Sequence, residues 1–234
     1  MSPRGCLVTI VVFVAIVLGV LWFALPPIAG GLATAALTNA GVRGTDTRVE
    51  VGADPPLRLL FLDANRVRLR SSNVDIRNVH ADTVDVTLRD VSIGRRSFAF
   101  IEGSLTGVRV TPDSGPAFEA TSVQIAGPAA AARVVITVDR TSAQNLITSA
   151  VATSTGVAVS RVVLAAPDRV TVTTPRGAVS GRLDVTPGGD LVLLPSTGGS
   201  ISLVGTGPDQ PVRLRSVQVA GDGLEVAGVI NVSQ

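Results

Sequence analysis

Hydrophobic and polar residues alternate along most of the chain after residue 48, and this pattern predicts a β-rich protein. Val84, Val86 and Leu88 alternate with charged or hydroxyl-bearing residues, and the same two-residue period recurs in short segments up to residue 232. Strict alternation places successive side chains on opposite faces of a strand, so that one face is apolar and the other polar. A one-residue slip between Leu88 and Val91 suggests a β-bulge.

The part of the chain after residue 156 continues this period in short predicted strands separated by turns. The predicted strands cover residues 157–164, 169–174, 178–186, 190–194, 200–204, 212–219 and 224–232. Turns are predicted at Pro187-Gly188-Gly189 and Gly221-Asp222-Gly223. Adjacent short strands of this kind are typical of an antiparallel meander.

One segment in the middle of the chain has helical spacing instead. Its apolar residues are Ala143, Leu146, Ile147, Ala150 and Val151. These positions form one stripe on a helix, so the sequence predicts a helix over residues 141–155. Asp139, Thr141 or Ser142 can cap its start, and Gly156 supplies the left-handed stop.

The N-terminal segment from Leu7 to Leu25 carries no charge. As a helix it would span roughly 28 Å, close to the hydrocarbon thickness of a bilayer. With Arg4 before it, the positive-inside bias predicts a single-pass transmembrane anchor with a cytoplasmic N-terminus. The predicted organisation is an anchor or signal over residues 1–25 and an exported domain over residues 26–234.

Whether this segment is kept or cleaved stays open from the sequence. A signal peptide has a shorter apolar core, followed closely by a cleavage site of small residues. Here Pro26-Pro27 follows the core, and the first Ala-x-Ala is Ala33-Thr34-Ala35. The spacing favours a retained anchor in the cytoplasmic membrane; after cleavage the domain would be secreted to the envelope. A further helix is predicted from Pro26 to Gly41.

Composition excludes several function classes. The formal net charge of +2 is too small for a general nucleic-acid binder. Cys6 is the only cysteine, so no disulfide braces the chain. Aromatic residues are scarce, so the interior must be built from Val, Leu, Ile and Ala. Such small side chains either pack closely or leave a hollow, and composition does not choose between these two.

Residues for catalysis or metal binding are sparse. His80 is the only histidine, lysine is absent, and no cluster has zinc-ligand spacing. Asp82, Asp85 and Asp90 come nearest to an acidic cluster, and we interpret them as parts of a solvated strand face. The sequence therefore predicts a protein that is not an enzyme and that needs neither metal nor cofactor.

Two other features point to lipid. Arg66, Arg68 and Arg70 share one face of a predicted strand, with Arg58 shortly before, and arginine forks suit phosphate oxygens. The segment from Leu57 to Leu62 is apolar almost without interruption. The arginines are either a headgroup site or simply a solvated strand face. The apolar segment is either a wall of a lipid-contacting groove or an ordinary part of the core.

Several segments carry a family pattern. They are the helix ending at Gly41, Val49-x-Val51-Gly52 leading into Pro56-Leu57, the strand Val84 to Ile93, Ile136-Thr137-Val138-Asp139 before the central helix, and Gly223-Leu224-Glu225-Val226-x-Gly228 near the end. With these segments the chain resembles the LmeA-like phospholipid-binding proteins of actinobacterial cell envelopes.

The resemblance implies an α+β, β-rich fold of the tubular lipid-binding type, related to the bactericidal/permeability-increasing proteins. In that fold a highly curved antiparallel sheet wraps around one or two helices and leaves an apolar groove for acyl chains. It also implies an anionic phospholipid as partner, held for lipid transfer or as an accessory to glycolipid synthesis. The family supplies no catalytic residues.

On this interpretation two sets of residues form the site. The acyl-chain contacts are Leu57, Leu59, Leu60, Phe61, Leu62, Leu146, Ile147 and Val151, and the headgroup contacts are Arg58, Arg66, Arg68 and Arg70. A β-rich ectodomain that acts as a structural or protein-interaction module is the main alternative. An enzyme of glycolipid synthesis is a third, and it would depend on Asp82, Asp85 or His80.

Overall fold

The computed structural model describes residues 42–54, 63–76, 79–92, 95, 97–110, 118–204, 212–221 and 223–230. The predicted anchor at residues 7–25, the predicted helix at 26–41 and the apolar segment at 57–62 lie outside these residues. No helix within the described ranges has the length and apolar character needed to cross a bilayer.

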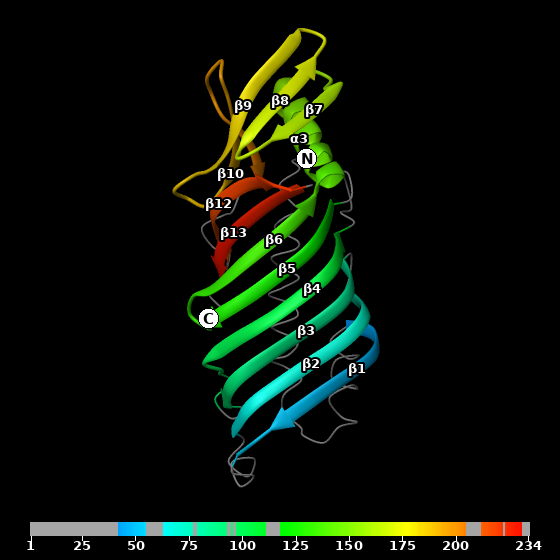
Figure 1. The fold of residues 1–234 in the computed structure, drawn as a ribbon, viewed down its shortest axis with the longest axis vertical. Coiled ribbons are helices and arrows are strands. Elements are labelled where there is room, and N and C mark those ends of the chain that lie inside the picture. The colour runs from blue at the N-terminus through cyan, green and yellow to red at the C-terminus, as the bar shows by residue number, and fades with distance from the viewer. Residues whose placement is uncertain are drawn as a thin grey trace.

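Most of the described strands form one eight-stranded antiparallel sheet. Its spatial order is β1-β2-β3-β4-β5-β6-β13-β12. The strands are β1 (Val42–Gly52), β2 (Asp63–Ile76), β3 (Val79–Ser92), β4 (Phe100–Val110), β5 (Phe118–Pro128), β6 (Ala132–Asp139), β12 (Val212–Ala220) and β13 (Gly223–Ile230). Figure 1 shows these strands stacked as a twisted ladder along the long axis of the molecule.

A smaller antiparallel sheet of five strands lies at the other end of the molecule from β1 (Figure 1). It consists of β7 (Arg161–Ala165), β8 (Arg169–Thr174), β9 (Gly177–Val185), β10 (Leu191–Pro195) and β11 (Ile201–Val204). The helix α3 (Arg140–Thr155) connects β6 of the large sheet to β7 of the small one. The predicted β-rich α+β class is therefore confirmed in the described part of the chain.

The predicted meander is only partly correct. The strands from β7 to β11 do follow one another as neighbours in the small sheet, but β13 pairs with β6 and β12 pairs with β13. The alternation shows that a segment is a strand with one apolar face, but it does not name the partner strand. Here the two last strands, after the small sheet in the sequence, extend the large sheet.

Each strand buries one face. In β3 the side chains of Val84, Val86 and Leu88 are at most 2 % exposed, whereas Arg89 on the opposite face is exposed. Valine, leucine, isoleucine and alanine make up almost the whole described core, and Phe98 is its only aromatic residue. The predicted aliphatic interior is therefore confirmed for the described residues.

The alternation of buried and exposed residues is interrupted at paired positions of β2 and β3. In β2 the buried Ser71 and Val74 flank two outward-facing residues, and in β3 the buried Ala81 and Val84 do the same. Asn73 has a φ of 48°, a left-handed conformation that asparagine tolerates better than most residues. Because both strands slip together, the pairing of β2 with β3 continues without a register shift.

The interruption predicted between Leu88 and Val91 has the same form. Asp90 has a φ of 51°, and the opposing strand slips between the buried Ala64 and Val67. The break in the pattern is therefore confirmed, but it is no bulge in the β2–β3 pairing, because both strands carry it and the register is unbroken.

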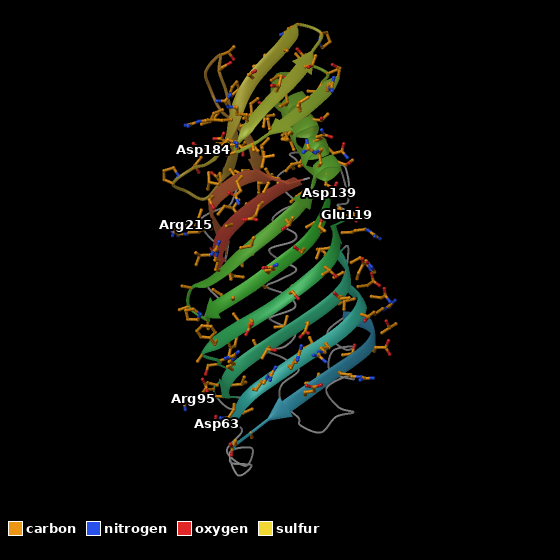
Figure 2. The ribbon with its side chains drawn as sticks, viewed as in Figure 1. Asp63, Arg95, Glu119, Asp139, Asp184 and Arg215 are labelled. Carbon is orange, nitrogen blue, oxygen red and sulfur yellow. The ribbon has the colours of Figure 1, made fainter. Side chains whose placement is uncertain are left out.

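The helix α3 begins and ends as the sequence predicts. Asp139 is the N-cap, and its Oδ1 accepts a hydrogen bond from the backbone N–H of Ser142 at 3.0 Å. Gly156 ends the helix in the left-handed conformation, with φ at 67°, and donates its N–H to the carbonyl of Ala152. Figure 2 shows Asp139 where β6 leads into the helix.

The cap should contribute measurably to stability. Asp139→Ala leaves an N–H of the first turn without its acceptor, and we expect the free energy of unfolding to fall by about 1 kcal/mol. Urea denaturation of the full chain, followed by far-UV circular dichroism, measures the change. Asp139→Asn is the control because asparagine caps equally well; equal losses in both variants would contradict the role of the cap.

The helix is also the link between the two sheets. It packs against β5, β6 and β13 of the large sheet and against β7 and β11 of the small one. Gln144 donates from Nε2 to the carbonyl of Val162 at 2.9 Å, and Arg140 donates to the carbonyls of Leu164 and Gly221. The bonds to Val162 and Leu164 tie the helix to β7 of the small sheet, and the bond to Gly221 ties it to the β12–β13 turn of the large sheet.

Candidate functional site

The predicted acyl-chain residues fall into two groups. Leu57, Leu59, Leu60, Phe61 and Leu62, with the headgroup candidate Arg58, lie outside the described residues. The other three are on α3, where Leu146 is 7 %, Ile147 0 % and Val151 5 % exposed. The apolar stripe of the predicted helix is therefore confirmed, and its contact with lipid stays a prediction.

The predicted arginine stripe lies on the polar face of β2, and part of it is engaged by an acid. Arg68 donates from Nε and Nη2 to the two carboxylate oxygens of Asp85, at 2.9 and 2.6 Å. Arg70 donates to the same carboxylate at 3.3 Å. The hydrogen bond from Arg68 and the two positive charges hold the pKa of Asp85 below its usual range. Asp85 is thus an internal counter-ion for the stripe.

The surroundings of Arg66 differ from those of Arg68 and Arg70. In the register of β2 and β3 it faces Arg89, which forms an ion pair with Glu102 at 3.0 Å. The described residues hold no ion pair with Arg66 itself. A polar groove of about 510 Å³ runs over this face, but it contains Asp85 and Glu102 besides the arginines. The mixed charges make it a weaker anion site than the sequence alone predicts.

His80 lies between two carboxylates on the same sheet. Its Nδ1 is 2.7 Å from Asp75 Oδ1, and its Nε2 is 3.2 Å from Asp82 Oδ1. The hydrogen bond with Asp75, assisted by the charges of both acids, raises the pKa of His80 above 6.5. Its neighbour across the sheet, Arg109, pairs with Glu119. This arrangement stabilises the protonated imidazole.

The cluster predicts a pH-dependent contribution to stability. Because the folded state raises the pKa, the contribution is complete below the unfolded pKa of about 6.5 and is lost as the pH rises through the folded value. At pH 6 we expect the free energy of unfolding of the wild type to exceed that of His80→Gln by about 1 kcal/mol or less, as for other exposed ion pairs. This difference should shrink as the pH rises to 8. Urea titrations at several pH values measure it. A difference that grows with pH would contradict the assignment.

A different site is more suited to an apolar ligand. A pocket of about 220 Å³ lies between the end of α3 and one face of the small sheet. Apolar side chains line most of it: Val157, Val170, Val172, Val179, Leu193 and Ile201. Val151 of the helix stripe also lines it, so one of the predicted acyl-chain residues does face an apolar pocket.

The polar groups of this pocket are few. Arg176 lines it from the turn between β8 and β9, and Thr155, Thr174, Ser180 and Thr197 contribute hydroxyls. No carboxylate is among the described lining residues. An apolar pocket with a few polar groups at defined positions is the usual form of a small-molecule site.

The sequence predicts the strands that line this pocket, but it does not identify them as parts of a site. Val172, Val179 and Ile201 have the ordinary alternation of a strand, and Arg176 stands alone in a turn. The signal that could have indicated the site is the Pro-Arg-Gly turn after the apolar β8. That this turn and the end of α3 line the same pocket follows only from the tertiary structure. The described residues contain no group of three or more possible metal ligands.

Comparison with known proteins adds no identification. No protein-family description, no curated protein and no solved structure matches the chain.

Proposed function

We propose that this protein binds phospholipid in the cell envelope and holds acyl chains against α3 and the sheets. The observation that carries the proposal is the apolar pocket beside α3, which includes Val151 of the predicted acyl-chain set. The proposal includes a tubular lipid-binding fold like that of the LmeA-like proteins, with a curved sheet around helices. It also includes tethering to the cytoplasmic membrane by residues 7–25 and no catalytic activity.

Energetics define what such a protein must supply. Withdrawing an acyl chain from a bilayer exposes hydrocarbon at about 0.8 kcal/mol per methylene, or roughly 12 kcal/mol for sixteen carbons. An apolar lining has to replace the lost contact. The aliphatic walls of the pocket supply it for part of a chain, and the apolar segment Leu57 to Leu62 is proposed to supply more.

In this proposal, arginines on the polar face of the large sheet contact anionic headgroups. Arg66 is the best placed of the described residues, since Arg68 and Arg70 share Asp85. Arg58 stays in the proposed set with the apolar segment that it belongs to.

A packed interaction module is the second candidate, and a specific observation favours it. On the apolar face of the large sheet, Leu88, Ile101, Leu105 and Ile136 are at most 1 % exposed. Side chains so completely covered leave no room for a hydrocarbon tail beside them. A lipid must therefore use the pocket beside α3 or a space formed with other parts of the chain.

Native mass spectrometry of the full chain distinguishes the two candidates. The protein is purified in detergent from its own membranes without added lipid, and the detergent is removed in the spectrometer. We expect a fraction of the protein to carry phospholipid, and Val179→Trp, which fills the pocket, to reduce that fraction. Val163→Trp is the matched control, because Val163 is 39 % exposed and does not line the pocket. Repeated lipid-free preparations of the wild type would refute the proposed function.

A further inference from the structure

One charged residue, which lies in a turn, is among the described residues that line the pocket. Arg176 follows Pro175 between β8 and β9, and its backbone N–H donates to Thr174 Oγ1 at 3.2 Å. The same hydroxyl donates to the carbonyl of Gly177 at 3.1 Å, and Gly177 has a φ of 122° that favours glycine. The turn therefore fixes the backbone of Arg176 beside the pocket.

The guanidinium has no acid to neutralise it within the described part of the chain. The ion pairs of the small sheet include Arg182 with Asp184 at 3.2 Å, but none involves Arg176. The other polar lining groups are hydroxyls, and Thr155 already donates to the carbonyl of Val151 at 2.8 Å. Among the described residues that line this mostly apolar pocket, Arg176 is thus the only charged one.

We infer that this pocket takes one fatty acid, with its hydrocarbon tail against Val172, Val179 and Ile201 and its carboxylate on Arg176. The inference rests on the proposed lipid-binding function and names the ligand of this pocket. This carboxylate contact in the small sheet is additional to the headgroup contacts proposed for the arginines on β2.

Charge and geometry favour a carboxylate over a phosphate monoester, and the small volume of the pocket disfavours the two-chain phosphodiester of a phospholipid. The planar guanidinium donates two parallel hydrogen bonds to the two oxygens of one carboxylate, and this pairing balances one positive with one negative charge. A phosphate monoester carries about −1.5 to −2 at pH 7 and accepts through three oxygens, so a single guanidinium would leave it under-satisfied.

Volume selects one short or partly inserted chain. The pocket of about 220 Å³ is smaller than the roughly 300–1,000 Å³ of pockets that enclose a drug-sized ligand, so it suits part of one hydrocarbon chain. A two-chain lipid would leave its second chain outside this pocket.

Methyl NMR on the full chain in a nonionic detergent tests the inference. Valine, leucine and isoleucine methyl groups are labelled, and decanoate or decanol is titrated into separate samples. We expect decanoate to shift the methyl signals of Val172, Val179 and Ile201 and to bind at least tenfold more tightly than decanol. Signals from the large sheet, such as those of Ile136, should stay in place.

Two variants separate the contributions of head and tail. Arg176→Gln should abolish the preference for decanoate over decanol, whereas Arg161→Gln, an exposed arginine outside the pocket, should leave it intact. Val179→Trp should prevent both probes from binding. Because Arg176 is exposed in a turn, its replacement tests the inference even if the tryptophan variant does not fold.

The other outcomes overturn the inference in distinguishable ways. Equal affinity for both probes, or a preference that survives Arg176→Gln, refutes the carboxylate contact and leaves the proposed function standing if phospholipid co-purifies. Tighter binding of decyl phosphate than of decanoate also refutes it, in favour of a phosphate headgroup. Absence of any shift, together with lipid-free preparations, refutes both proposals.

Discussion

Replacing Ile147 with alanine is expected to lower the free energy of unfolding by about 2–5 kcal/mol, the range for removing a large aliphatic side chain from a core. Ile147 is fully buried on α3. The helix packs against strands of both sheets, so a cavity at this position weakens the junction that holds them together. Urea denaturation of the full chain in nonionic detergent measures the loss.

The control is Val163→Ala on β7. Val163 is 39 % exposed, so its truncation should change stability by no more than about 0.5 kcal/mol, as for other surface substitutions. If Ile147→Ala were equally mild, α3 would not be held between the sheets as described. A loss confined to part of the unfolding transition would show that the two sheets unfold separately.

Replacing Gly223 with alanine should be the other strongly destabilising change. Gly223 begins β13 and pairs with Asp139, and a Cβ at this position would collide with the backbone carbonyl oxygen of Val138. Neither group is a flexible side chain, so the strands themselves must separate. Overpacking of this kind costs about 1–3 kcal/mol. The shift would also disturb Asp139, the cap of α3, and so adds to the loss.

Gly188→Ala provides the matched control. Gly188 lies in the turn between β9 and β10, and the nearest atom to an added Cβ is Thr186 Oγ1 at 3.6 Å, an ordinary contact. Denaturation midpoints of the two variants, measured side by side, should therefore differ clearly. Similar midpoints would mean that β13 does not approach β6 as closely as the structure has it.

Some parts of the candidate site could be predicted from the sequence, and others could not. The stripe of α3 was predictable because helical spacing places Leu146, Ile147 and Val151 on one side whatever they pack against. The internal neutralisation of Arg68 was not, because Asp85 lies on another strand and its distance depends on the β2–β3 register. The role proposed for Arg176 could not be predicted either, because the other residues that line its pocket lie on separate elements.

What the sequence by itself determined is the local structure of the described chain. The two-residue period defined the strands and their apolar faces, and Asp139 and Gly156 set the ends of α3, because these signals act between residues close in the chain. The tertiary structure alone decided which strands pair, so that β12 and β13 return to the large sheet. It also decided that the end of α3 and the Arg176 turn border one apolar pocket. These outcomes depend on which apolar faces cover one another, and many strands share the same alternating pattern, so no local signal distinguishes one partner from another.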